Sequence, residues 1–369
     1  MDLKALIELS RKYGSDPDFV LAGGGNTSFK EGDTMAVKAS GNALSTISED
    51  GFVLMDTEKL RALTKAEYPG GDKEREACAL RDMMAARLPG EGEKRPSVEC
   101  ILHALFGKRY VLHVHPAVVN GLTCGQDGEA VARDLFEDSK ESFLWIPLTK
   151  PGFTLSKKCA EMFEAHNKEH GEYPSILLIR NHGIFVAADS PEETDSLMMD
   201  AVSRISKKIA RPPDLGSAVV LPEGAADAAM KIESRYSVEV GFLYNKEIAR
   251  LVADREAYAP MLKPFSPDHI VYCRAYPLFF DSMDSLEKGF HEYDLAYGGT
   301  PKIVAVRGLG VFALGKDAAD SETASMLFMD ALKIAVYSES FGGPLALPDD
   351  FTDFIVNWES ESYRQKKLS

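Results

Sequence analysis

The stretch of sequence that decides the fold reads Pro174-Ser175-Ile176-Leu177-Leu178-Ile179-Arg180-Asn181-His182-Gly183-Ile184-Phe185-Val186. Two apolar runs of strand length lie on either side of a short polar break that contains His182. A helix is expected over residues 191–209, because Pro191 stands at its start, where a missing N–H costs little. The stretch therefore predicts strand, turn, strand and helix in succession.

The same kinds of element are expected on both sides of this stretch. A helix is expected over residues 3–14, and two strands should flank the turn Glu31-Gly32-Asp33. Further helices are predicted over residues 57–66 and 74–87, and further strands over residues 110–115 and near Trp145. Helices that alternate with strands favour an α/β layered domain. The segment 211–216 and the Ala/Gly-rich run after it indicate a linker.

A second copy of the central stretch is visible at residues 301–313, where Pro, Arg, Gly and Phe recur in register. Both copies precede an acidic loop and a helix that contains Met-Asp-Ala, although any strand-turn-strand-helix unit would look broadly similar. Leu309 stands where the first copy has His182. We therefore expect a catalytic domain over residues 1–211 and a degenerate, partial second copy without metal ligands over residues 225–369.

Composition restricts the class of protein. With 45% hydrophobic and 27% charged residues, the chain has the profile of a globular protein with a sizeable core. A formal net charge of -15 argues against nucleic acid as a partner, and no apolar run is long enough to cross a bilayer. The start of the chain lacks the features of a signal peptide. The five cysteines are odd in number and form no C-x-x-C pair, so we expect no disulfide framework and a cytoplasmic protein.

Three histidines and a glutamate form a candidate metal site. His113 and His115 lie two residues apart on an expected strand, so both face the same side; taken alone, they would also suit a solvated strand edge. His182 lies at the break between two strands, and Glu99 lies near the start of an expected helix. Three imidazoles and a carboxylate suit Zn2+ and are tolerated by Mn2+, Co2+ or Fe2+. His103, one helical turn after Glu99, is more typical of a packed residue or of a partner to a ligand.

Three segments could bind an anion. The cluster Gly23-Gly24-Gly25 allows a close backbone approach, and Asn26 and Ser28 add polar side chains. Lys38-Ala39-Ser40-Gly41-Asn42 is a second such turn, and Ser97 near the expected helix start is a third position that favours phosphate. The glycine spacing does not match a dinucleotide-binding motif.

Five motifs in order resemble the class II aldolase/adducin family. They are Gly24-Gly25-Asn26-Thr27-Ser28, Lys38-Ala39-Ser40-Gly41, Pro96-Ser97-Val98-Glu99, His113-Val114-His115-Pro116 and Asn181-His182-Gly183, and they cover roughly residues 1–210. The chain looks closest to the long rhamnulose-1-phosphate aldolase-type domain. The resemblance implies a three-layer α/β/α sandwich around a mixed, largely antiparallel central sheet. It implies His113, His115 and His182 as metal ligands, Glu99 as the acid/base, and Asn26, Ser40, Gly41 and Ser97 as contacts of the substrate phosphate.

The expected activity is that of a carbon-carbon lyase of carbohydrate metabolism. A zinc-type aldolase would reversibly cleave a ketose phosphate to dihydroxyacetone phosphate and a short aldehyde, through a metal-stabilised enediolate. The resemblance also implies a homo-oligomer, and no motif identifies the proton-donating tyrosine that family aldolases commonly use. A sugar-phosphate 4-epimerase and a decarboxylase of sugar-acid phosphates share the same metal and phosphate groups. A non-catalytic, adducin-like scaffold is the alternative of another class.

Overall fold

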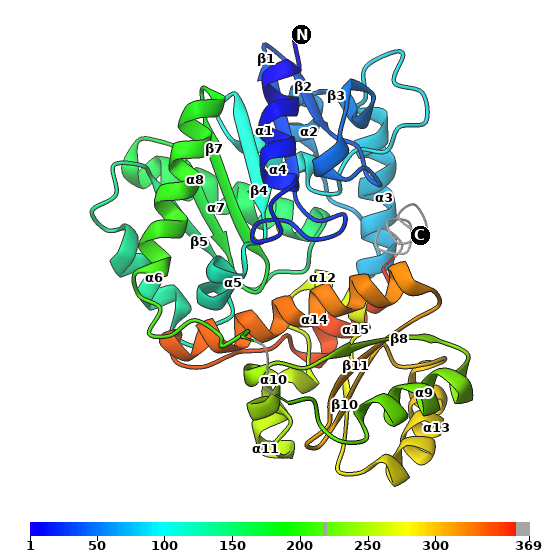
Figure 1. The fold of residues 1–369 in the computed structure, drawn as a ribbon. Helices are drawn as coiled ribbons and strands as arrows, with labels where there is room; N and C mark the ends of the chain where they lie inside the picture. The colour runs from blue at the N-terminus through cyan, green and yellow to red at the C-terminus, as the bar shows by residue number, and fades with distance from the viewer. Residues whose placement is uncertain (217–219, 359–369) are drawn as a thin grey trace. The chain divides into compact units, whose positions relative to one another are not determined.

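The computed structural model describes residues 1–216 and 220–358, and their contacts divide them into two compact units (Figure 1). The first unit comprises residues 1–123, 127–208 and Trp358, and the second comprises residues 124–126 and the described part of 209–357. The expected domains, residues 1–211 and 225–369, stay a prediction, since residues 124–126 group with the second unit and Trp358 with the first.

The first unit is built on a seven-stranded sheet with the order β3-β2-β1-β4-β7-β6-β5. All neighbouring strands are antiparallel except β5 and β6, which are parallel. The strands are β1 (Asn26–Glu31), β2 (Thr34–Lys38), β3 (Phe52–Asp56), β4 (Tyr110–Val114), β5 (Phe143–Ile146), β6 (Ile176–Ile179) and β7 (Gly183–Ala188). The sheet is therefore mixed and largely antiparallel, as expected.

Helices cover both faces of this sheet (Figure 1). The helices of the first unit are α1 (Lys4–Gly14), α2 (Thr57–Leu63), α3 (Asp72–Ala85), α4 (Cys100–Leu105), α5 (Ala117–Thr123), α6 (Gly128–Phe136), α7 (Phe153–His170) and α8 (Pro191–Ser206), with 3₁₀ turns η1 (Leu44–Thr46) and η2 (Glu49–Gly51). Helices α1 and α8 pack against one face, while α4 and α7 pack against the other. The expected three-layer α/β/α sandwich is confirmed.

The core beneath α4 and α7 is closely packed with apolar side chains. Val111 of β4 and Phe185 of β7 pack there with Leu102 of α4 and Phe163 of α7, and all four are almost fully buried. His113 points to this same face, because it lies two residues after Val111 on β4. None of the helices in residues 1–216 and 220–358 is long and apolar enough to span a membrane.

Strand pairing brings three chain segments together at one end of the central strands β1, β4 and β7. Register pairs His113 of β4 with Phe185 of β7, and pairs Asn26 of β1 with the same His113. The end of β4, the beginning of β7 and the beginning of β1 therefore lie side by side. The turn that carries His182 joins β6 to β7 at the same end of these strands, so residues distant in sequence meet there.

The second unit contains a four-stranded sheet with the order β8-β11-β10-β9. Its elements are α9 (Ala225–Tyr236), β8 (Glu239–Leu243), α10 (Lys246–Leu251), α11 (Arg255–Tyr258), η3 (Ala259–Leu262), α12 (Pro267–Cys273), β9 (Leu278–Phe280), η4 (Met283–Ser285), α13 (Leu286–Tyr297), β10 (Ile303–Val306), β11 (Gly310–Gly315), α14 (Ala318–Ser338), η5 (Glu339–Phe341) and α15 (Asp349–Val356). Its successive pairings are antiparallel, antiparallel and parallel. The strands β4-β7-β6-β5 of the first unit follow the same sequence of pairings.

Local geometry of the two copies also agrees. Both turns contain a residue with positive φ, Asn181 at 55° and Gly308 at 68°. Phe242 pairs with Phe312 in the second sheet as His113 pairs with Phe185 in the first, so Phe242 takes the place of His113. These correspondences support the proposed degenerate repeat, in which Phe242 and Leu309 stand at the positions of two of the proposed metal ligands, His113 and His182.

The segment expected as a linker is partly folded. Residues 211–216 form no helix or strand, but Arg211 makes ion pairs with Glu247 at 2.9 Å and with Glu339 at 2.8 Å. Residues 217–219 lie outside the described residues. Much of the Ala/Gly-rich run forms α9 instead, because alanine favours helix and this helix buries Ala228 and Ile232 in the core of the second unit.

We expect Gly308→Ala to destabilise the second unit by about 1–2 kcal/mol, since an alanine at positive φ is strained even in open space. Gly107→Ala is the matched control, because Gly107 lies outside the left-handed region and its Cβ would meet no atom closer than 4.0 Å. Urea unfolding followed by circular dichroism measures both. Equal unfolding midpoints for the two variants would contradict the strain.

Candidate metal centre

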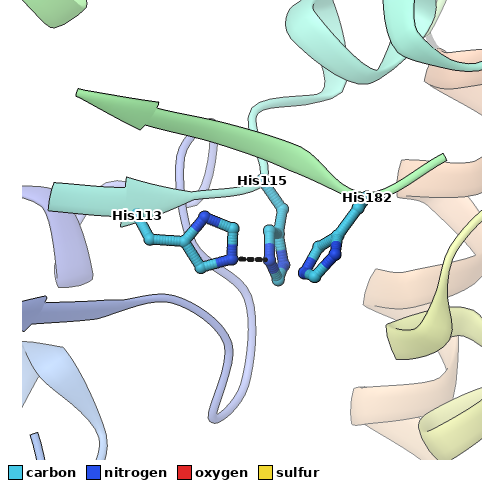
Figure 2. A group of neighbouring side chains, drawn as sticks. All are labelled: His113, His115 and His182. Atoms are coloured by element: carbon cyan, nitrogen blue, oxygen red, sulfur yellow. Dashed lines mark hydrogen bonds between the residues drawn. The ribbon is translucent and has the colours of Figure 1, made fainter. Parts of the chain in front are cut away.

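Three histidines converge at the end of the central strands β4 and β7 of the first sheet (Figure 2). His113 is on β4, His115 follows the end of that strand, and His182 lies in the turn before β7. One ring nitrogen from each lies within 4.8 Å of the others, and Nε2 of His113 is 2.9 Å from Nε2 of His115. The described residues hold no other such group of three potential metal ligands among His, Cys, Asp and Glu.

The tautomer of His113 is fixed by its surroundings. Its ring stacks on Phe185 with centroids 3.8 Å apart, and its Nδ1 lies 2.9 Å from the carbonyl oxygen of Ile184. A carbonyl oxygen only accepts, so Nδ1 donates the proton. Burial lowers the pKa of His113 well below its ordinary value, which keeps the ring neutral. The lone pair of Nε2 therefore faces the other two histidines, as a metal ligand requires.

The turn before β7 depends on close backbone packing. Asn181 adopts a φ of 55°, and the N–H of His182 donates to the carbonyl of Ile179 at 3.1 Å. A Cβ atom on Gly183 would lie 2.7 Å from the carbonyl oxygen of Val114 and 2.7 Å from the ring of His115. Only glycine fits at that position, and its absent side chain allows the histidines to approach one another.

Glu99 lies against the histidine cluster. Its Oε1 is 3.0 Å from Nε2 of His182, and its Oε2 is 3.3 Å from Nε2 of His113. Nδ2 of Asn26 donates to Oε2 at 2.7 Å. Burial opposes ionisation of this carboxyl, but the contacts with His182 and with the amide of Asn26 outweigh burial and hold the pKa of Glu99 well below its usual range. The arrangement thus offers three nitrogen atoms and one carboxylate.

The helix expected near Ser97 begins later than expected. Helix α4 starts at Cys100, so Glu99 lies just before it, in a turn where the Glu99 N–H donates to the Ser97 hydroxyl at 3.3 Å. A serine side chain that bonds the backbone two residues on competes with helix at this point. Glu99 is therefore the N-cap residue of α4: its carbonyl accepts from the N–H of His103 at 3.0 Å, while its side chain reaches the histidines.

His103 supports the centre and contributes no nitrogen to it. Its Nδ1 is 2.8 Å from the hydroxyl of Ser28, and its Nε2 is hydrogen-bonded to Oδ1 of Asn26. Burial lowers the pKa of His103 to about 3, with the charge of Lys30 adding to the effect, so the ring is neutral. Both nitrogens are engaged, and the ring orients the asparagine that contacts Glu99.

The three segments predicted to bind an anion are linked by Lys38, to which the sequence analysis gave no role beyond its place in one of these segments. Nζ of Lys38 donates to the carbonyls of Gly23 at 3.0 Å and Gly25 at 2.9 Å. The N–H of Ser97 donates to the carbonyl of Lys38 at 2.9 Å, and that of Ser40 donates to the carbonyl of Arg95 at 2.8 Å. The glycine loop, the Ser40-Gly41 turn and Ser97 are therefore held together. A lysine in an otherwise apolar strand was the available signal.

The fold and the motifs agree with one protein family. A family model described as Class II Aldolase and Adducin N-terminal domain matches residues 4–203, which is more than half of the 369-residue chain. The chain belongs to the class II aldolase and adducin family. Class II aldolases use a divalent metal, and the largely buried histidine triad could bind one.

Individual relatives are distant. The uncharacterized oxidoreductase YuxG of Bacillus subtilis (strain 168) is 25% identical over 412 aligned positions, covering 98% of this chain and 58% of that protein. The chain thus spans little more than half the length of this curated relative. An N-terminal class II aldolase domain of a conserved protein from Thermoplasma acidophilum is 27% identical, with a TM-score of 0.47, covering 56% of this chain and 93% of that one. L-fuculose-1-phosphate aldolase from Thermus thermophilus is 17% identical, with a TM-score of 0.36, covering 56% of this chain and 94% of that one.

Metal analysis tests the centre directly. We expect about one divalent ion per chain in protein purified without chelator or histidine tag, and its loss in the double variant His113→Gln/His182→Gln. His166→Gln/His170→Gln is the control, because these two histidines on α7 have ring centroids 4.4 Å apart but lie outside the triad. Elemental analysis by mass spectrometry measures all three proteins. Equal metal in both double variants would contradict the assignment.

Proposed function

We propose that the chain is a divalent-metal aldolase that reversibly cleaves a ketose phosphate to dihydroxyacetone phosphate and a short aldehyde. The observation that carries this proposal is the position of Glu99, whose two carboxylate oxygens lie 3.0 Å and 3.3 Å from nitrogens of His182 and His113. A potential acid/base thus lies beside a potential metal centre, as carbon–carbon cleavage next to a carbonyl requires.

His113, His115 and His182 would hold the ion, with Zn2+ the simplest choice and Mn2+, Co2+ or Fe2+ alternatives. Two features of these residues fit a metal: the neutral, correctly oriented His113 and the mutual approach of three ring nitrogens. When bound, a divalent ion supplies Lewis-acid stabilisation of the negative charge that develops on the substrate oxygens.

Glu99 would move the proton. The surroundings of Glu99 hold the pKa of its carboxyl well below the usual range, so the group is ionised. An ionised carboxylate is the form that can accept a proton. Glu99 is also 6% exposed, which limits competition from water. Asn26 fixes one oxygen of the carboxylate through its amide, and His103 in turn fixes Asn26.

Ser40, Gly41 and Ser97 would bind the substrate phosphate together with Asn26. The glycine loop, the Ser40-Gly41 turn and Ser97 are joined through Lys38, so their backbone and hydroxyl groups form one preorganised region. The amide of Asn26 already donates to Glu99, so orientation of that carboxylate is its first role in this arrangement. Phosphate binding remote from the cleaved bond would then orient the ketose.

The other candidate functions differ in what they need from these residues. A 4-epimerase or a decarboxylase would use the same metal and phosphate groups, so the products of the reaction distinguish them. A scaffold needs none of these groups, and burying His113, His182 and the Glu99 carboxylate with no ion to bind costs stability. A phosphorylated sugar as substrate and a homo-oligomeric assembly in the cytoplasm remain parts of the proposal.

Product analysis tests the proposal. Metal-loaded protein is incubated with a panel of ketose 1-phosphates, and release of dihydroxyacetone phosphate is followed by a coupled assay. We expect Glu99→Gln to lower kcat by about 10²–10⁴-fold, since it removes the proton-transfer group. Glu76→Gln, a change of a buried glutamate that bonds the N–H groups of Phe153 and Thr154, is expected to retain activity.

The outcome separates the candidate reactions. An epimeric sugar phosphate would identify a 4-epimerase, and carbon dioxide from a sugar-acid phosphate would identify a decarboxylase. No carbon–carbon cleavage of any ketose phosphate by metal-loaded protein would contradict the aldolase.

A further inference from the structure

A cationic cleft lies at the opposite end of strand β1 from the histidine cluster. Its volume is about 380 Å³, and its charged lining residues are Lys30, Glu31, Arg61, Lys108 and Arg109. Four of these side chains are cationic and one is anionic, on a chain whose formal net charge is -15. The concentration of positive charge is therefore local and runs against the composition of the whole chain.

Two of the cations already have carboxylate partners. Nζ of Lys108 lies 2.8 Å from Asp189, and a guanidinium nitrogen of Arg61 lies 2.8 Å from Glu58. The one acidic lining residue, Glu31, lies 3.8 Å from the amino group of Met1. These groups largely balance one another, so they do not account for the positive charge of the cleft.

Lys30 carries the uncompensated charge. It is 7% exposed, and its Nζ donates to the carbonyl of His103 at 2.8 Å. Within residues 1–216 and 220–358 it has no ion pair with a carboxylate. Burial lowers the pKa of Lys30 to about 7, and the charge of Arg61 adds to this while Asp189 opposes it. A buried ammonium in this state is stabilised by an anion that reaches it.

Arg109 is the second cation without a carboxylate partner among the described residues. Its guanidinium lies 5.1 Å from the centroid of the Phe29 ring, which supports it from one side. A planar guanidinium held on an aromatic face keeps its N–H groups available for a bidentate contact with an oxyanion. Lys30, with its compact ammonium group, and Arg109, with its planar guanidinium group, thus line the same small cleft.

We propose that this cleft binds a phosphate dianion, either free or as the monoester of a small metabolite. The cleft is lined by donors that suit phosphate oxygens, and its volume admits a small molecule. It is separate from the proposed substrate site, because Lys30 and Asn26 lie four residues apart on β1, roughly 13 Å along the strand. The proposal therefore stands whether or not the chain is an aldolase.

Calorimetry with defined anions tests the cleft. Inorganic phosphate and glycerol phosphate are titrated into the metal-loaded wild type, and tighter binding of one or the other tells the free ion from the monoester. We expect Arg109→Ala to weaken one class of phosphate sites by about tenfold or more, since it removes a charge-assisted contact. Arg133→Ala is the matched control, because Arg133 is an exposed arginine paired with Glu129 outside the cleft.

A second variant separates this site from the proposed substrate site. Ser97→Ala should weaken phosphate binding at the substrate site and leave the cleft unchanged. Phosphate binding to Arg109→Ala with the stoichiometry and affinity of the wild type and Arg133→Ala would overturn the proposal. That result would leave the aldolase proposal untouched, since no residue of the cleft contacts the histidine cluster directly among the described contacts.

The pH dependence of sulfate binding tests Lys30 itself. Sulfate keeps its charge between pH 6 and pH 8, so a change in its affinity reports on the protein. Because Lys30 loses its proton as the pH rises through about 7, we expect affinity to fall by about tenfold between pH 6 and pH 8. Lys30→Met should abolish that dependence, and unchanged dependence in this variant would overturn the role of Lys30.

Other charged groups near Lys30 do not produce the same change. The charged groups around Lys30 are the arginines at 61 and 109, Lys108, and the carboxylates of Glu31, Glu58 and Asp189. The ion pair of Lys108 with Asp189 raises the pKa of Lys108 and lowers that of Asp189, so both keep their charges between pH 6 and pH 8. His103 stays neutral because its pKa is about 3. The amino group of Met1 lies 3.8 Å from Glu31, and the Lys30→Met variant, which keeps this pair, separates its contribution from that of Lys30.

Discussion

The antiparallel pairing of β4 with β7 is the constraint on which the proposed metal centre depends. That register places His113 opposite Phe185 and brings the end of β4 next to the turn that carries His182. The ring of Phe185 then supports His113 by stacking, and the carbonyl of Ile184 takes its Nδ1 proton. A slip of one residue would turn His113 to the opposite face of the sheet, away from Glu99. The chemistry of the site is therefore a consequence of sheet register, which the buried apolar residues of both strands maintain.

Sequence patterns predicted the strands and the helix of the central stretch and the members of the histidine cluster. Strand periodicity placed His113 and His115 on one face, and the polar break between apolar runs located His182. The contacts of Asn26 with Glu99 and of Lys38 with the glycine loop could not be predicted in this way. Each joins residues far apart in the chain through side chains, and local patterns carry no information about such pairings. The start of α4 was missed because the Ser97 hydroxyl competes locally with helix, and α9 was missed because Ala/Gly-rich composition suits linkers and helices alike.

The second unit shows which parts of the central stretch serve the fold and which serve a site. Its turn keeps a left-handed residue, and Gly308 adopts this conformation at lower conformational cost than Asn181 does. The N–H of Arg307 donates to the carbonyl of Phe280 at 2.8 Å, as that of Arg180 donates to Ile146 at 3.0 Å. The histidine positions, by contrast, are taken by apolar side chains. The topology of the sheet is thus compatible with either set of residues, which supports a copy that has lost its ligands and kept its fold.

His103 connects the two ends of β1, although it contributes nothing to a metal directly. Its ring is hydrogen-bonded to Asn26 and Ser28, and its carbonyl accepts from Lys30 further along the same strand. In the neutral ring, Nε2 donates to Oδ1 of Asn26 and Nδ1 accepts from the hydroxyl of Ser28, in a site with no exposed surface. Burial and the nearby Lys30 charge both favour that neutral form. Neutral His103 fixes the orientation of the Asn26 amide, and that amide fixes Glu99. The geometry of Glu99, the proposed acid/base, therefore depends on a buried ring whose charge state the surrounding packing determines.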